Sequence, residues 1–211
     1  MFIKPAFSNR NFITAFILTL TIGLYLVIDS FIIGRNEFFI VLNKDLGKTA
    51  DLFFSYWTNL GDGAIWIVIA TLFFIYRKNK LPLLIAAIIV STLITQLTKN
   101  FLFPAEPRPT SAIQDLSRIH TVPGVELHTA YSFPSGHTAT AFTIYLLACL
   151  CIRRSWVMPL GFIYAMLVAY SRIYLAQHFP LDVGGGMITA LITMLISLYI
   201  QQRWEKRKPL L

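Results

Sequence analysis

Long apolar segments constrain this chain more than any other feature of its sequence. A membrane-spanning helix needs about 20 mostly apolar residues, and runs of that length recur along the whole chain. We therefore predict an all-α polytopic membrane protein whose helices form a bundle. Six segments qualify as spans: residues 12–33, 55–76, 81–98, 136–152, 155–174 and 181–201.

Composition supports a membrane protein. Only 13% of the residues are charged, whereas a typical soluble domain carries about 25%. At 211 residues we expect a single domain over residues 1–211. The first apolar run, about Phe12 to Ile33, is longer than the core of a signal peptide, and no A-x-A-like cleavage site follows it. We therefore interpret this run as a retained first span.

Basic residues predict the orientation in the membrane. Eleven of the 18 basic residues lie on one side of a six-span arrangement, together with only one acidic residue, Glu205. The positive-inside rule makes that side cytoplasmic, with both termini on it. This clustering explains most of the net charge of +8, so we expect no nucleic-acid partner. The eleven residues are Lys4, Arg10, Arg77, Lys78, Lys80, Arg153, Arg154, Arg203, Lys206, Arg207 and Lys208.

Three other segments carry structural expectations. Phe38, Leu42 and Leu46 recur every four residues and predict a short interfacial helix before the second span. Residues 100–134 form a long extracytoplasmic connection with five of the ten prolines, and loops of this length are usually functional or disordered. The glycines at 184–186 are costly in a helix and predict close helix packing, with room for substrate as the alternative.

Ionisable residues gather at the predicted extracytoplasmic ends of the spans. Each has an ordinary explanation alone, such as a lysine that reaches the interface or a first-turn acid. Their convergence at one depth indicates function, because ionisable groups at span borders are costly. The residues are Lys99 and Arg172 at span ends, His137, His178 and Asp182 at span starts, and Arg108 in the long connection.

These residue types suit the chemistry of a phosphate group. Three cations match a dianion, and arginine adds two-point hydrogen bonding. Ser135 and Gly136 open a helix, whose free backbone N–H groups favour an anion. Asp182 can orient the ring of His178 so that its other nitrogen attacks phosphorus, and His137 can protonate the leaving oxygen.

Three ordered motifs carry a resemblance to a known family. They are "KNFLFPAEPRP" from Lys99, "PSGH" at residues 134–137 and "SRIYLAQHFPLD" at residues 171–182. The set resembles the type 2 phosphatidic acid phosphatase (PAP2) family, the membrane relatives of vanadium haloperoxidases. The first motif departs from the family pattern, because eight residues instead of six separate Lys99 from Arg108. This departure bears on the role of Lys99 more than on that of Arg108.

The resemblance implies a PAP2/haloperoxidase-like core and a metal-independent lipid phosphatase without a cofactor. It assigns the nucleophile of a phosphohistidine mechanism to His178, the orienting role to Asp182 and the general acid to His137. The implied phosphate-binding residues are Lys99, Arg108, Ser135, Gly136 and Arg172.

Several alternatives stay open at this point. The implied substrates are undecaprenyl diphosphate, phosphatidylglycerol phosphate, phosphatidic acid and lipid A, and a phosphotransferase or a non-enzymatic transporter are the rival functions. We expect a bacterial inner membrane, contact with membrane lipids and no obligate protein partner. Neither a disulfide between Cys149 and Cys151 nor a zinc site is expected, since no HExxH-like pair exists. Asp62, His120 and His128 have no assigned role, and the two histidines are interpreted as solvated loop residues.

Overall fold

The computed structural model describes residue 6 and residues 8–207, and all the regular secondary structure in this part of the chain is helical, with no strand. A helix satisfies its own backbone polar groups, as a lipid environment requires. The α-helices are α1 Arg10–Ile32, α2 Arg35–Leu42, α3 Lys48–Trp57, α4 Ile65–Tyr76, α5 Leu81–Leu97, α6 Pro109–Ala112, α7 Gly136–Cys151, α8 Val157–Tyr174 and α9 Pro180–Arg207.

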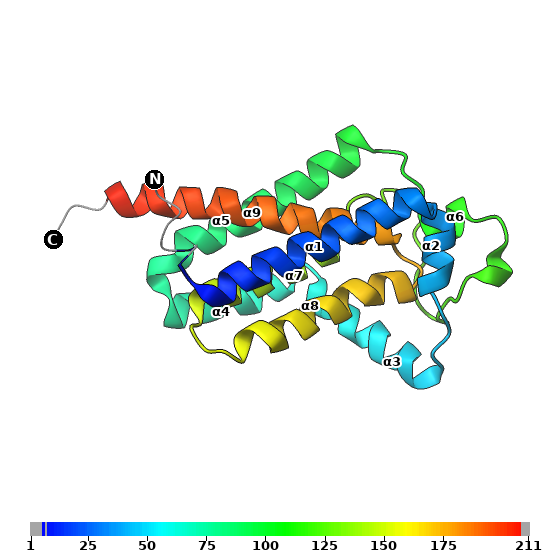
Figure 1. The fold of residues 1–211 in the computed structure, drawn as a ribbon, viewed down its shortest axis with the longest axis horizontal. Coiled ribbons are helices and arrows are strands. Elements are labelled where there is room, and N and C mark those ends of the chain that lie inside the picture. The colour runs from blue at the N-terminus through cyan, green and yellow to red at the C-terminus, as the bar shows by residue number, and fades with distance from the viewer. Residues whose placement is uncertain (1–5, 7, 208–211) are drawn as a thin grey trace.

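Helix α9 lies at the centre of the bundle. It packs against α1, α5 and α7, and α7 in turn packs against α8 (Figure 1). The residues of α9 that face these neighbours are small or apolar, and Gly184, Met187, Ala190 and Met194 are buried. The C-terminal helix is therefore the element around which the others are arranged.

The all-α membrane architecture is confirmed, and the count of six spans stays a prediction. Within the described part of the chain, four helical segments are long and apolar enough to cross a membrane: Arg10–Ile32, Lys78–Leu102, Val157–Tyr174 and Pro180–Arg207. Helix α7 is apolar but shorter, with 16 residues. The pair Lys48–Gly61 and Ile65–Tyr76 qualifies only as one broken span, bent by 52°.

This bend corrects the prediction of a continuous span over residues 55–76. The chain tightens to a 3₁₀ turn over Thr58–Gly61 and starts α4 only at Ile65. The side chain of Asp62 accepts a hydrogen bond from the backbone N–H of Ala64 at 2.8 Å. Such a local bond offers the backbone an alternative to continuing the helix, so the apolar run is interrupted next to the site.

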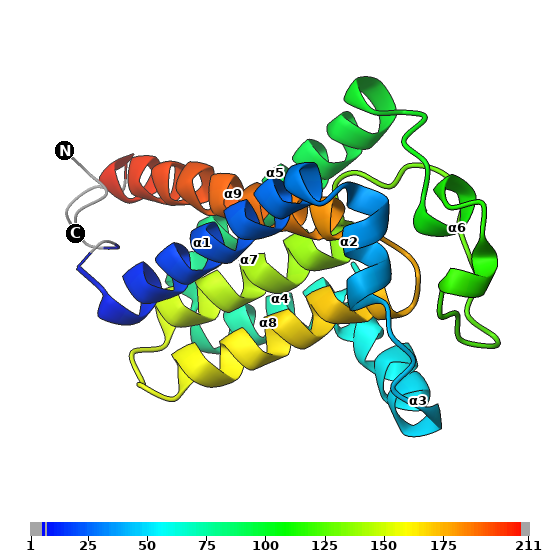
Figure 2. The same cartoon turned by 45° about the vertical axis from the view of Figure 1, so that its right-hand side comes forward.

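The predicted interfacial helix is present as α2 but ends before Leu46. It follows α1 directly and crosses the end of the bundle (Figure 2), with Phe38 and Phe39 buried. Gly34 and Gly47 stand immediately before α2 and α3, with φ of 89° and 84°. Glycine adopts this left-handed region without the steric cost that other residues meet, so the chain can turn sharply at both positions.

The described basic residues of the predicted cytoplasmic set gather at one end of the bundle. The start of α1, the end of α9 and the connections α4–α5 and α7–α8 all lie at the left of Figure 1. Lys4 and Lys208 lie outside the described residues. The starts of α7 and α9 and the end of α8 lie toward the opposite end, which we call the motif end.

The three consecutive glycines of α9 allow close packing, as the sequence predicts. A Cβ atom on Gly184 would lie 2.7 Å from the backbone oxygen of Gly23 in α1. One on Gly186 would lie 2.6 Å from the backbone oxygen of Ser135, at the start of α7. Both distances are too short for a real contact, so larger residues would push α1 and α7 away from α9.

Candidate active site

The nucleophile candidate and its orienting carboxylate are adjacent and buried. The side chains of His178 and Asp182 are each 2% exposed, and His178 Nδ1 lies 3.4 Å from Asp182 Oδ2. This distance is long for a hydrogen bond, as is common in sites without substrate. A proton on Nδ1 directed at the carboxylate leaves Nε2 with its lone pair free.

The carboxylate of Asp182 is held by its own set of donors. Its Oδ2 accepts hydrogen bonds from Ser132 Oγ at 2.5 Å and from the backbone N–H of Phe179 at 2.9 Å. Its backbone oxygen also accepts from the N–H of Ser135 at 2.9 Å. These bonds tie the start of α9 to the segment that precedes α7, and they fix the carboxylate beneath the ring of His178.

A tight turn after α8 places His178 beside Arg172. The backbone oxygen of Arg172 accepts from the N–H groups of Gln177 and His178 at 2.9 and 3.0 Å. Within this turn Ala176 has a φ of 54°, a left-handed conformation that is strained for a residue with a side chain and typical of functional segments. The third motif therefore folds into a turn in which the backbone of His178 is hydrogen-bonded to that of Arg172.

The guanidinium of Arg172 is buried and only partly paired. It is 7% exposed, and its NH1 donates to Thr58 Oγ1 at 2.6 Å. Among the described residues, Arg172 Nε has no hydrogen-bond partner. A buried unpaired donor is costly, and this N–H is therefore available to a hydrogen-bond acceptor that enters the site.

Arg108 enters the site from the long connection. It is buried, and its side chain donates to the backbone oxygens of Ala130 and Gln177, each at 3.0 Å. Gln177 in turn donates to the backbone oxygen of Glu126 at 2.9 Å. The loop is therefore locked to the turn that carries His178, and the arginine has a fixed orientation.

Lys99 also reaches the site despite the lengthened first motif. It lies in a π-helical turn, Thr98–Leu102, that extends α5. Its Nζ donates to the backbone oxygen of Tyr131 at 2.9 Å, and it lies within electrostatic range of Arg108, Asp182 and Arg172. The eight residues between Lys99 and Arg108 lie partly in this turn and partly in the segment after it. A turn of this width changes the direction in which the following side chains point.

Ser135 caps α7 and leaves Gly136 open. The Ser135 side chain accepts from the N–H of Thr138 at 3.4 Å, so it is the N-cap of α7. A Cβ on Gly136 would meet only Thr95, at 3.6 Å, so the space beside this glycine is open, unlike that beside Gly186. The helix start therefore offers backbone N–H groups and a free approach.

His137 has a carboxylate neighbour that the sequence motifs do not include. Its Nε2 lies 4.0 Å from Asp62 Oδ2, and the 3₁₀ turn before Asp62 packs on α7, where a Cβ on Gly61 would lie 3.0 Å from the backbone oxygen of His137. The signal in the sequence is a single acidic residue between apolar runs, at the predicted depth of the other site residues. Motif spacing could not assign it.

The environment of His178 favours its neutral ring. Burial first, and then the charges of Arg108, Lys99 and Arg172, lower the pKa of His178 well below its usual 6.5. A positive charge on His137 acts in the same direction, which places the two rings in electrostatic contact. Neutral imidazole is the form that can attack an electrophile.

Other residues hold the catalytic segment from outside. Arg35, at the start of α2, forms an ion pair with Glu106 and lies over the ring of Phe179, with its Cζ 4.9 Å from the ring centre. The N–H of Ser132 donates to the backbone oxygen of Glu106 at 3.1 Å. No sequence pattern links these positions, because the contacts join three segments far apart in the chain.

The two loop histidines differ, which corrects half of the prediction that both are solvated. His128 is exposed, with a side-chain fraction of 54%. His120 is largely covered, and its Nε2 lies 2.9 Å from Asp51 Oδ1, which also accepts from the Tyr174 hydroxyl at 2.6 Å. Ligand atoms of Asp45, Asp51 and His120 lie within 4.8 Å of one another. This group links the loop to α3 and α8, away from the histidine–aspartate pair.

Comparison with known proteins identifies the family. Residues 80–206, which include all three motifs, match the PAP2 superfamily. This chain belongs to the PAP2 superfamily. The matched residues include those that form the site, and the match agrees with the family that the three motifs resemble.

Solved PAP2 structures have the same fold. The crystal structure of Aquifex aeolicus LpxE is 34% identical, with a TM-score of 0.66, over 76% of this chain and 92% of that one. A transmembrane PAP2 type phosphatidylglycerolphosphate phosphatase from Bacillus subtilis has a TM-score of 0.60, over 95% of this chain and 99% of that one. At 20% identity, the second shows the fold alone.

Curated relatives of this chain include proteins named as undecaprenyl-diphosphatases and as a lipid A 4'-phosphatase. An undecaprenyl-diphosphatase of Sulfolobus acidocaldarius is 27% identical over 179 residues, which cover 83% of each chain. A putative undecaprenyl-diphosphatase of Escherichia coli, YbjG, is 33% identical over 64% of each chain. A lipid A 4'-phosphatase of Porphyromonas gingivalis is 30% identical over 66% of this chain and 64% of its own length.

Proposed function

We propose that this protein is a membrane lipid phosphatase that hydrolyses a phosphate monoester or pyrophosphate of a lipid. One observation carries the proposal: three cations, Lys99, Arg108 and Arg172, surround a buried histidine–aspartate pair. One of these cations keeps an unpaired donor. The names of the relatives, undecaprenyl-diphosphatase and lipid A 4'-phosphatase, support this class of substrate.

In the proposed first step, His178 Nε2 attacks the phosphorus atom of the lipid phosphate. A phosphorus–nitrogen bond forms as the bond from phosphorus to the leaving oxygen breaks. His137 donates a proton to that oxygen. The negative charge of the bound phosphate, together with the carboxylate of Asp62 4.0 Å away, favours the charged ring from which the proton comes. Asp182 stabilises the positive charge that develops on His178.

In the proposed second step, water attacks the phosphohistidine. The phosphorus–nitrogen bond breaks, and His137, now neutral, accepts the proton that water loses. Inorganic phosphate leaves and both histidines return to their starting states. The cations and the N–H groups at the start of α7 stabilise the charge on the phosphoryl oxygens through both steps.

We propose that the reaction takes place at the extracytoplasmic face. The basic residues gather at the opposite end of the bundle, and the positive-inside rule makes that end cytoplasmic. The lipid chain would lie between helices while the phosphate meets the cations. No cofactor is needed for these steps, since the protein's own side chains supply nucleophile, acid and charge.

A phosphate-release screen over lipid phosphates in detergent tests this function. Undecaprenyl diphosphate, phosphatidylglycerol phosphate, phosphatidic acid and lipid A form the panel. We expect phosphate release from at least one, loss of release in His178→Ala, and retention in His128→Ala, the exposed loop histidine. Hydrolysis that survives His178→Ala would refute the mechanism. Phosphate found on an added lipid alcohol instead of in solution would identify a phosphotransferase, and no turnover of any kind would favour the transporter.

A further inference from the structure

The end of the bundle opposite the catalytic residues has an apolar groove between α4 and α7. Its volume is about 530 Å³, and its walls are almost entirely hydrocarbon. The groove runs to the last residue of α7, where it meets Arg77. The apolar lining residues are Ile69, Leu72, Phe73, Ile144, Leu147 and Ala148.

A basic recess adjoins the end of this groove. Arg77 and Cys151 line both cavities. The recess, of about 350 Å³, is further lined by Asn79, Lys80 and Arg153, with no acidic residue on its wall. Arg77 is already oriented there, since its NH2 donates to the backbone oxygen of Cys151 at 3.4 Å.

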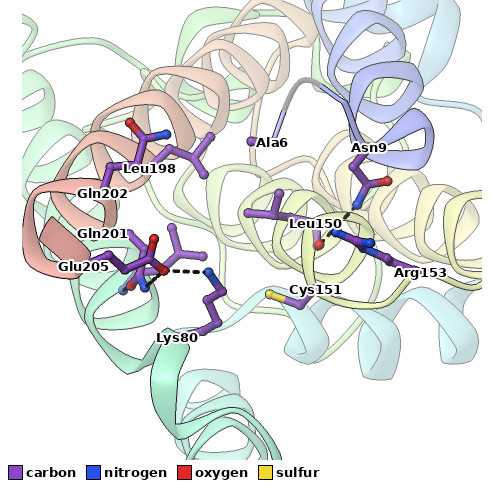
Figure 3. A pocket seen from close by; sticks show the side chains of 11 residues that line it. Ala6, Asn9, Lys80, Leu150, Cys151, Arg153, Leu198, Gln201, Gln202 and Glu205 are labelled. Atoms are coloured by element: carbon purple, nitrogen blue, oxygen red, sulfur yellow. Dashed lines mark hydrogen bonds and ion pairs between the residues drawn. The ribbon is translucent and has the colours of Figure 1, made fainter. Parts of the chain in front are cut away.

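Only one of the three cations of the recess has an ion-pair partner among the described residues. Lys80 is paired with Glu205, at 2.9 Å between Nζ and Oε1. Figure 3 shows this pair on the opposite side of the neighbouring pocket from Arg153. Among the described residues, no carboxylate lies within ion-pair distance of Arg77 or Arg153. The recess therefore has uncompensated positive charge next to a hydrocarbon-lined groove.

We propose that the groove and recess together bind an anionic phospholipid in the leaflet opposite the catalytic site. The groove takes an acyl chain, and Arg77 and Arg153 take the phosphate of the head group. A basic pocket between membrane helices at the cytoplasmic side is a typical anionic-lipid site, and a hydrocarbon groove distinguishes a lipid from a free anion. The lipid fills the space between α4 and α7 and stays intact, because His178 lies at the other end of the bundle.

Native mass spectrometry of the full-length, delipidated protein tests this site. The probes are dioleoylphosphatidylglycerol and dioleoylphosphatidylcholine, which share their chains and differ in net charge. In Arg77→Gln/Arg153→Gln, the dissociation constant of the most tightly bound phosphatidylglycerol molecule should rise at least about tenfold. The dissociation constant of phosphatidylcholine should not change. The control, Lys78→Gln/Arg154→Gln, removes two charges from the same connections but from neither cavity, and should bind as the wild type does.

A second variant tests the groove without changing charge. Ala148→Trp places a ring between α4 and α7 and should weaken phosphatidylglycerol binding by a similar factor. Millimolar glycerol 1-phosphate should not displace the lipid. The proposal would be overturned if phosphatidylglycerol binding were unchanged in both Arg77→Gln/Arg153→Gln and Ala148→Trp. It would also be overturned if the two charge variants lost equal affinity, or if glycerol 1-phosphate displaced the lipid. If the arginine variant loses its thermal transition, Ala148→Trp decides alone.

Discussion

At the scale of single residues, the catalytic proposal depends on how Asp182 and His178 act as a pair. Three donors converge on one carboxylate oxygen: Ser132, the N–H of Phe179 and the ring of His178. An amide in place of that carboxylate keeps the shape but cannot stabilise the imidazolium. It can also favour the wrong tautomer of the ring.

Asp182→Asn should therefore lower kcat by up to about ten-thousandfold, the loss that the same change causes in a Ser-His-Asp triad. Ser132→Ala should cost less, because two donors to the carboxylate remain. Steady-state phosphate release with the best lipid substrate measures both. A loss below about tenfold in Asp182→Asn would show that the ring of His178 does not depend on this carboxylate.

The neighbour of His137 provides a second test at this scale. Asp62→Asn removes the carboxylate 4.0 Å from the ring and should slow the protonation of the leaving group by about tenfold or more. The loss should be large for a lipid alcohol and small for an aryl phosphate, whose leaving oxygen needs no proton. Asp115→Asn, in the same protein but outside the site, is the control. Equal losses for both leaving groups would remove Asp62 from this role.

The pH dependence follows from the lowered pKa of His178. Because that pKa lies well below 6.5 in the folded protein, the neutral nucleophile persists as pH falls through 6.5. We expect kcat/KM to show no loss from this group in that range. The unfolded chain, with its ordinary pKa, binds the proton first, so the free energy of unfolding should decrease below pH 6.5. A pH–rate profile that falls about tenfold per unit from 6.5 downward would contradict this.

The sequence predicts where most of the candidate site residues lie, but it does not predict the residues that support them. His137, His178, Arg172 and Asp182 stand in motifs whose local spacing fixes their relation, such as the turn between Arg172 and His178. Gln177 and Arg35 support the site through contacts across about 70 positions of the chain, and such contacts leave no local pattern. Asp62 was visible as an isolated acid, but only the folded chain shows which ring it faces.

At the scale of elements, the start of α7 depends on the shape of α9. Gly186 lets the backbone of α9 approach Ser135, and the start of α7 carries both the helix N-terminus and His137. Membrane helices rely on such small residues because lipid supplies no hydrophobic force between helices. The sequence predicted this packing from composition, but not which helix each glycine faces.

Gly186→Ala should therefore lower both the thermal stability in detergent and the activity. The added Cβ would lie 2.6 Å from the backbone oxygen of Ser135, so α7 must shift by a few tenths of an ångström or more. Gly63→Ala is the matched control, since nothing lies within 4 Å of a Cβ there. Equal melting temperatures for the two variants would show that α7 and α9 are less tightly packed than described.

The broken span shows where pattern reasoning fails at this scale. Residues 55–76 read as one apolar run, yet the chain bends by 52° near Gly61 and Asp62. The side chain of Asp62 accepts a hydrogen bond from the backbone of Ala64 at the point where one helix ends. The same carboxylate lies 4.0 Å from the ring of His137. The interruption is thus explained by the site and not by the hydropathy of the segment.

At the scale of the whole molecule, the two ends of the helical bundle have different proposed tasks. We propose that the motif end performs the phosphate chemistry and that the opposite end, where α1 begins and α9 ends, binds an anionic lipid. The division rests on the clustering of basic residues at alternate connections. The six-span topology that places these ends on opposite faces stays a prediction.

Reporter fusions test that topology. A phosphatase reporter inserted at Gly124, in the loop over the motif end, should be active in the extracytoplasmic space. A fluorescent reporter after the C-terminus should be fluorescent in the cytoplasm. The opposite pattern would place the catalytic residues in the cytoplasm and exchange the leaflets of the two proposed lipid sites.

The central claim is that phosphate passes through His178, and the trapped intermediate tests it most directly. The purified protein is mixed with its best lipid substrate, quenched in alkali within the first turnover, and digested for peptide mass spectrometry. We expect a phosphohistidine at His178 that is absent from His178→Ala. In His137→Ala it should accumulate with an aryl phosphate as substrate, because that leaving oxygen needs no proton while hydrolysis still lacks its base. Full turnover without phosphate on His178, or phosphate on another residue, would contradict the account.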